Sequence, residues 1–113
     1  MVEEFQPVFD RLRTMMLAAA PTMVITKDTP GSLELRTAEL DQKTKERGWF
    51  GTVTIKKTYV AVHLLPLYTK PDLAASCSAD LSKRRQGKTC FNFRRIDDRM
   101  FDELNELMRR CAA

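Results

Sequence analysis

The chain has 113 residues, of which 43% are hydrophobic and 30% charged, and its formal net charge is +4. This length fits one domain with its own core and is short for two. The mild positive charge permits contact with nucleic acid or an anionic surface without requiring it. Three cysteines and one histidine, without a CxxC motif, argue against a disulfide framework or a zinc site.

Targeting and membrane signals are not expected. The first residues lack a basic, apolar leader, and no apolar run approaches the ~20 residues that a membrane span needs. We therefore expect a soluble protein of the reducing cytoplasm that makes no membrane contact and carries no cofactor.

The first segment predicts an amphipathic helix that begins near Gln6 and ends before Pro21. Proline suits the first turn of a helix, as at Pro7, and disfavours helical geometry in the residue before it, as at Pro21. The apolar residues at helical spacing are Val8, Leu12, Met15, Met16 and Ala19.

Four β-strands are predicted next, as two hairpins. The first hairpin joins residues 23–28 to 33–37 through Pro30-Gly31, a tight-turn dipeptide. In the second, residues 49–55 place Trp49 and Gly51 on one face, with Phe50 and Thr52 on the other. On the strand from Tyr59 to Leu65, the core face carries Val60, Val62 and Leu64, and the opposite face carries Tyr59, Ala61 and His63.

The rest of the chain predicts an interrupted helix, a strand and a final helix. Residues 71–85 have broken helical periodicity, with Ser78 as a cap of the second part and Gly87 as its end. Residues 89–94 alternate again, so that Phe91 and Phe93 face the core. After the N-cap Asp97, the apolar stripe of the last helix is Met100, Phe101, Leu104, Leu107, Met108 and Cys111.

This order predicts one α+β domain over residues 1–113. Strands that follow one another with helices at both ends favour a single antiparallel sheet, here of about five strands. We expect the N- and C-terminal helices to pack on one face of that sheet.

Two phrases in the second half of the chain resemble a known family. They are Lys57-x-Tyr59-Val60-x-Val62-His63-Leu64-x-Pro66-x-Tyr68 and Gln86-Gly87-Lys88-x-Cys90-Phe91-Asn92-Phe93, with Leu81-x-Lys83 between them. They resemble the YdhG-like family of small bacterial α+β domains, whose function is largely undefined. The resemblance covers most of the chain and is best from Phe50 onward. It implies a secretion-chaperone-like fold and, for some relatives, iron handling by analogy with frataxin, but no catalytic residues.

The leading functional hypothesis concerns the sheet face opposite the helices. By the two-residue strand period, this face gathers polar and aromatic side chains that suit a small polar ligand or a protein partner, including a second copy of the chain. A strand histidine is more often a packed residue than a catalyst, and no nucleophile–base or acid–base pair can be named. We therefore expect a non-enzymatic binding module. Its candidate ligand-binding residues are Tyr59, His63, Thr52, Thr54, Cys90 and Asn92.

A basic patch gives the nucleic-acid alternative. Its residues are Lys83, Arg84, Arg85, Lys88, Arg94 and Arg95. Cations could meet phosphates, and Phe91 or Phe93 could stack on bases if exposed, but a net charge of +4 is a weak electrostatic footprint. Gly87-Lys88-Thr89 looks like the end of a P-loop, yet Ser82 stands where the first glycine belongs and a strand follows instead of a helix.

Metal or iron binding is the remaining alternative. Asp98, Asp102 and Glu106 recur on the last helix and could offer oxygen ligands to a hard cation. The same helix also predicts i,i+4 ion pairs, Arg99–Glu103 and Glu106–Arg110, which are typical of an ordinary exposed helix. No metal site is assigned from this pattern.

Overall fold

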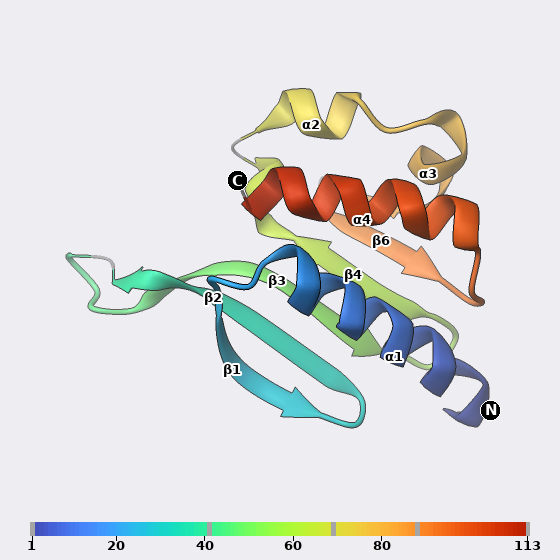
Figure 1. Ribbon diagram of the computed structural model, residues 1–113, viewed down its shortest axis with the longest axis horizontal. Helices are drawn as coiled ribbons and strands as arrows, with labels where there is room; N and C mark the ends of the chain where they lie inside the picture. Colours follow the sequence, from blue (N-terminus) through green and yellow to red (C-terminus); the bar gives the residue numbers. More distant parts are fainter. Residues whose placement is uncertain (1, 41, 69, 88, 113) are drawn as a thin grey trace.

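In the computed structural model, residues 2–40, 42–68, 70–87 and 89–112 are described, without the side chains of residues 2–4 and 47. One antiparallel sheet runs through them in the strand order β1-β2-β3-β4-β6-β5 (Figure 1). The strands are β1 (Val24–Thr29), β2 (Ser32–Leu40), β3 (Arg47–Ile55), β4 (Val60–Leu64), β5 (Arg85–Gln86) and β6 (Cys90–Phe93). The helices are α1 (Val2–Ala19), the 3-10 turn η1 (Leu65–Tyr68), α2 (Pro71–Ala75), α3 (Ala79–Arg84) and α4 (Asp98–Ala112).

The predicted α+β fold is confirmed, with one more strand than expected. The sixth strand is β5, which has two residues and pairs with β6. Gly87 therefore does not end the helix, as the sequence suggested; α3 ends at Arg84, and Gly87 turns the chain between β5 and β6 with a φ of 73°. Glycine adopts this left-handed backbone without a steric penalty.

Helices α1 and α4 lie side by side over one face of the sheet (Figure 1). The predicted apolar stripe of α4 is buried except for Met100, which is partly buried. Phe101 of this stripe meets Phe93 of β6 edge to face, with ring centroids 5.1 Å apart. Asp97 caps the helix by accepting from the backbone N–H of Met100 at 3.1 Å. The hydrophobic core therefore fills the space between these two helices and the sheet.

Helix α1 begins earlier than the sequence predicts. It starts at Val2 and includes Pro7, so the expected start near Gln6 is wrong. A proline inside a helix removes one backbone hydrogen bond. Burial of Val8, Phe9 and Leu12 immediately after it holds this part of the helix against the core. None of the helices in the described residues is long and apolar enough to cross a membrane.

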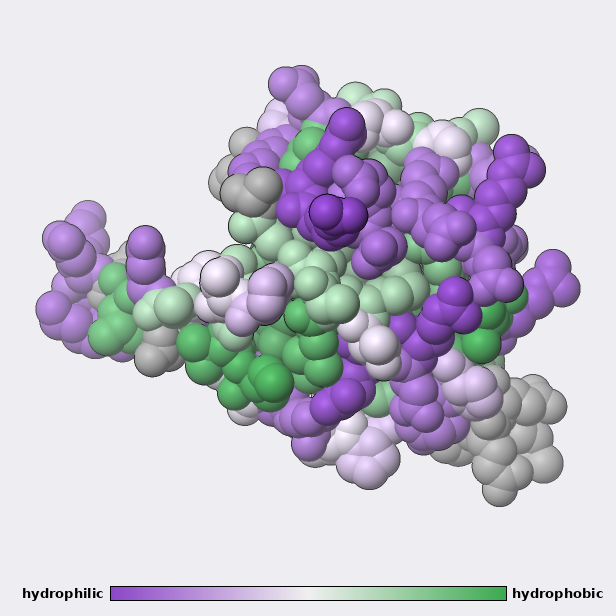
Figure 2. All heavy atoms as spheres, in the orientation of Figure 1, coloured by the Kyte–Doolittle hydropathy of each residue, from purple (hydrophilic) through white to green (hydrophobic). Residues whose placement is uncertain are grey.

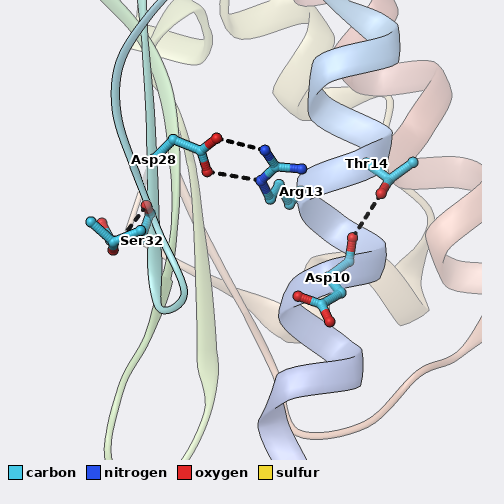
Figure 3. A network of polar contacts seen from close by, with 6 residues as sticks. Asp10, Arg13, Thr14, Asp28 and Ser32 are labelled. Atoms are coloured by element: carbon cyan, nitrogen blue, oxygen red, sulfur yellow. Dashed lines mark hydrogen bonds and ion pairs between the residues drawn. The ribbon is translucent and has the colours of Figure 1, made fainter.

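An ion pair ties α1 to the edge strand β1. Arg13 Nε and Nη2 donate to Asp28 Oδ1 and Oδ2 at 2.9 and 2.6 Å (Figure 3). The next residue of the helix, Thr14, donates from Oγ1 to the carbonyl oxygen of Asp10, one turn earlier, at 3.0 Å. The hydrogen bond from Arg13 holds the pKa of the Asp28 carboxyl below its usual range.

A β-bulge in β3 changes the alternation that the sequence suggests. Leu35 pairs with Gly51 and the next residue, Arg36, pairs with Trp49, so Phe50 is the extra residue. Phe50 and Gly51 are both buried, and Trp49 turns to the other face, where the Arg36 guanidinium lies 3.5 Å above its ring. The sequence predicted that Trp49 shares a strand face with Gly51, and Phe50 with Thr52. Both predictions are therefore wrong.

Glycine is required at position 51 by close packing. A Cβ there would lie 2.5 Å from the carbonyl oxygen of His63 and 3.0 Å from Met16 Cε of α1. Real Cβ atoms do not approach a carbonyl oxygen this closely. Gly51 thus lets α1 and β4 come close to the bulged part of β3.

Candidate functional site

The side of the sheet opposite α1 and α4, which we call the polar face, brings the predicted ligand-binding residues together. Strand register sets two rows across β3, β4 and β6, one of them continuing into β5. The rows are Thr52–His63–Cys90–Gln86 and Thr54–Ala61–Asn92. The register aligns five of the six predicted residues, and the sixth, Tyr59, lies immediately before β4. Their role in binding stays a prediction.

A short chain of hydrogen bonds crosses the polar face at β6 and β5. Cys90 Sγ donates to Asn92 Oδ1 at 3.3 Å, and Asn92 Nδ2 donates to Gln86 Oε1 at 2.6 Å. Each amide oxygen accepts one of these bonds, and the Nε2 group of Gln86 has two hydrogens to donate. This part of the polar face therefore offers donors to a ligand.

The protonation states of His63 and Cys90 favour binding chemistry over nucleophilic chemistry. Burial lowers the pKa of His63, and the positive charge of Lys56 lowers it further. Burial raises the pKa of the Cys90 thiol, which Lys56 opposes only in part. Both groups are then neutral at neutral pH, whereas an activated cysteine needs a thiolate beside a base.

A hollow of about 550 Å³ lies where the polar face meets the end of α3. Tyr59 and Asn92 line it from the sheet, so two of the six predicted ligand-binding residues are in a concave site. The other polar lining residues are Thr58 and Gln86, and the cations are Lys83, Arg84, Arg85 and Arg94. The ligand-binding residues and the basic patch, which the sequence presents as separate groups, thus share one site.

The cations of this hollow differ in how firmly they are held. Arg85 donates from Nε to the carbonyl oxygen of Gly87 at 3.1 Å and from Nη1 to that of Ala74 at 3.2 Å. Within the described part of the chain, Lys83, Arg84 and Arg94 have no carboxylate partner. Three cations here are consequently available to an anion.

A second hollow of about 350 Å³ shares Arg84 and Arg94 with the first. We call the first, which is the bigger of these two, the larger hollow. It is lined also by Phe93, Arg95, Asp97 and Met100. Asp97 places a carboxylate here, so the second hollow is less suited to an anion than the first. Arg95 belongs to this second hollow, and Lys88 lies outside the described residues.

Four of the predicted ligand-binding residues lie on the polar face but outside the described lining of the larger hollow. They are Thr52, Thr54, His63 and Cys90. Cys90 acts on the site indirectly, by donating to Asn92. The sequence did not identify Thr58 or Gln86 as candidate site residues. For Gln86 there was one indication, because it stands at the start of the second family-like phrase.

The acidic residues of α4 are distributed among separate partners. Asp98 accepts from Arg11 at 2.9 Å, and Glu106 lies 3.7 Å from Arg109. Glu103 accepts from both the hydroxyl and the backbone N–H of Ser78, at 2.6 and 2.7 Å. These contacts replace the predicted pairs Arg99–Glu103 and Glu106–Arg110. In the described residues, no group of three or more His, Cys, Asp or Glu side chains could hold a metal ion.

Comparisons with protein-family models, with curated proteins and with solved structures found no match. The resemblance to the YdhG-like family therefore stays a prediction, based on the phrases around Tyr59 and Cys90. Function is therefore inferred from the geometry of this chain alone.

Proposed function

We propose that this protein is a non-enzymatic binding module that takes a small polar ligand on the polar face, at the larger hollow. The observation that carries the proposal is the convergence of Tyr59, Asn92 and Gln86 around one concave site with three cations that have no carboxylate partner among the described residues. Its volume lies within the roughly 300–1,000 Å³ of small-molecule sites. A few polar groups that point into a hollow fix the orientation of a ligand.

Binding at this site uses the sheet as a rigid support. Tyr59 is held beside the β3–β4 turn, where its carbonyl oxygen accepts from the N–H of Lys56 at 2.8 Å. Asn92 is held by Cys90 and Gln86. A site whose side chains are already positioned loses less conformational entropy when a ligand binds.

The test is an NMR survey with a library of polar ring fragments. We expect fragments to shift the amide signals of residues near Tyr59, Gln86 and Asn92. The double variant Tyr59→Ala, Asn92→Ala should lose these shifts while remaining folded. Its matched control, Lys27→Ala with Thr29→Ala, changes the exposed edge strand β1 and should keep them. Shifts that persist in the first variant, or that gather elsewhere in the wild type, would remove the proposal.

Self-association is a second candidate, because large apolar side chains are exposed near β1 and β2. Ile25 is 49% and Leu40 55% exposed. Figure 2 shows hydrophobic surface near the end of α1, whereas hydrophilic side chains cover α4. Scattered exposed apolar residues are normal, so this candidate needs a contiguous contact. Sedimentation equilibrium of Ile25→Glu beside the wild type tests it: a wild-type dimer that dissociates in the variant supports the proposal.

Nucleic-acid binding and metal binding receive less support from the same structure. Phe91 and Phe93 are buried, so they are not available to stack on bases. The α4 carboxylates of Asp98 and Glu106 are paired with different arginines, Arg11 of α1 and Arg109 of α4. Both remain alternatives to the proposed small polar ligand.

A further inference from the structure

The larger hollow presents hydrogen-bond donors and cations on nearly every side. Gln86 offers its Nε2 group because its oxygen already accepts from Asn92. Lys83, Arg84 and Arg94 can only donate. In the described lining there is no carboxylate, so no side chain opposes an acceptor-rich, negatively charged group. A site of this composition selects an anion.

Mutual repulsion among the cations adds to this selectivity. Lys83 and Arg84 end α3, and Arg94 follows β6, so segments that are separate in sequence bring these charges to one hollow. Arg85 cannot turn away, because the carbonyl oxygens of Gly87 and Ala74 hold its guanidinium. An anion between them relieves the repulsion and forms charge-assisted hydrogen bonds, for which the planar guanidinium matches phosphate oxygens in pairs.

Another part of the lining suits a planar ring. Tyr59 is half-buried, immediately precedes β4, and lines the hollow together with Asn92. An aromatic side chain beside a cationic groove is a common way to stack a heterocyclic base. Gln86 and Asn92 belong to the same lining as the tyrosine and the arginines, and an amide can donate to a ring nitrogen or carbonyl.

Two features indicate which end of the larger hollow would bind the negatively charged group of a ligand. Arg84 and Arg94 line both hollows, so they stand at the boundary between them. On the far side, Asp97 repels an anion, and its carboxylate is committed to the N-terminus of α4. The negative group is therefore expected on the Tyr59 side of the arginine pair.

We propose that the larger hollow binds a phosphorylated ring compound of the nucleoside monophosphate class. Its phosphate contacts Arg84 and Arg94, its ring lies against Tyr59, and its ring acceptors meet Gln86. This inference rests on the proposed function, whose ligand class it names. A long nucleic acid fits less well, because the cations gather at one end of the polar face, which also carries Glu34.

The test measures binding of adenosine monophosphate, adenosine and inorganic phosphate by calorimetry, with amide shifts as the check of position. We expect the monophosphate to bind more tightly than either fragment. In Arg84→Gln with Arg94→Gln, its affinity should fall by about tenfold or more, because two charge-assisted contacts are lost. The control Arg109→Gln with Arg110→Gln removes the same charge from the end of α4 and should change affinity by less than about twofold.

Two further comparisons separate ring from phosphate and small ligand from polymer. Tyr59→Leu should weaken the monophosphate and leave inorganic phosphate unchanged. A short single-stranded oligonucleotide that binds more tightly than the monophosphate, with steep salt dependence, would overturn the small-molecule inference. So would equal losses in both arginine variants, or no binding of the monophosphate. If polar fragments still bind at Tyr59 and Asn92 in that last case, only the ligand class fails; if they do not, the proposed function fails as well.

Discussion

The two faces of the central strands share a backbone and differ in almost everything else. On β4 and β6, Val62 and Phe91 pair on the side of the helices and are fully buried. One residue further, His63 and Cys90 pair on the polar face and are only half-buried. The first pair is used for packing, and the second leaves polar groups near solvent.

This contrast shows how a small domain can separate stability from binding. Substitutions on the helix side change the volume of a close-packed core. Side chains of the polar face contact mainly their neighbours in the sheet, as in the bonds from Cys90 to Asn92 and from Asn92 to Gln86. We therefore expect a substitution to affect either folding or ligand binding, depending on the face it changes.

The sharpest form of this comparison uses neighbouring residues on one strand. Phe91→Ala should lower the free energy of unfolding by about 3–5 kcal/mol, because it empties a fully buried position. Asn92→Ala should cost about 1 kcal/mol or less, since it removes hydrogen bonds at a half-exposed position. Urea unfolding of both variants measures the difference. Similar losses in the two would show that the faces are not energetically distinct.

The next largest effect is expected at Gly51, where β3 packs closely against both α1 and β4. Gly51→Ala should lower the free energy of unfolding by about 1–3 kcal/mol through overpacking. The added methyl group would meet the carbonyl oxygen of His63, which belongs to a strand paired with β3 on one side and β6 on the other. Gly31→Ala is the matched control, because its nearest neighbour would be Ile55 Cβ at 4.0 Å. A tolerated Gly51→Ala would mean that β4 shifts easily under the bulge.

Local alternation predicted most of the sheet and only part of the site. The faces of Val60 to Leu64 and of Cys90 to Phe93 follow from the period of two, and so does the polar face. The bulge at Phe50 was not predictable, because it depends on how β2 pairs with β3 and leaves no local mark in a strand of mixed residues. It reversed the expected position of Trp49.

The larger hollow could not be predicted from the sequence for a similar reason. Its basic and polar residues were both identified, but separately. They meet because β5 pairs with β6 and thereby brings the end of α3 beside Asn92 and Tyr59. A two-residue strand has too few positions to show a period, so Arg85 and Gln86 appeared to continue the helix. Tertiary pairing therefore decided the site.

A smaller effect should appear on the polar face when the pH falls. Burial lowers the pKa of His63 in the folded protein, so the unfolded chain binds the proton more strongly. The contribution of neutral His63 is present above the unfolded pKa of about 6.5 and is lost as the pH falls below it. Because the chain has one histidine, His63→Asn should flatten the stability profile below about pH 6.5. An unchanged slope in the variant would assign it to other groups.

The smallest effect is expected at the edge of the sheet, where Arg13 of α1 forms an ion pair with Asp28 of β1. The arginine keeps the carboxyl ionised to lower pH, so its contribution is present above the unfolded pKa of Asp28 and is lost as the pH falls through the lowered one. NMR titration should show the pKa of Asp28 rising in Arg13→Leu. In the control Arg11→Leu, which removes the partner of Asp98, it should not change. Since the pair is partly exposed, its effect on unfolding should be far smaller than that of Phe91→Ala. A large loss of stability in Arg13→Leu would instead mean that the edge of the sheet depends on this contact, and that the covered face extends to β1.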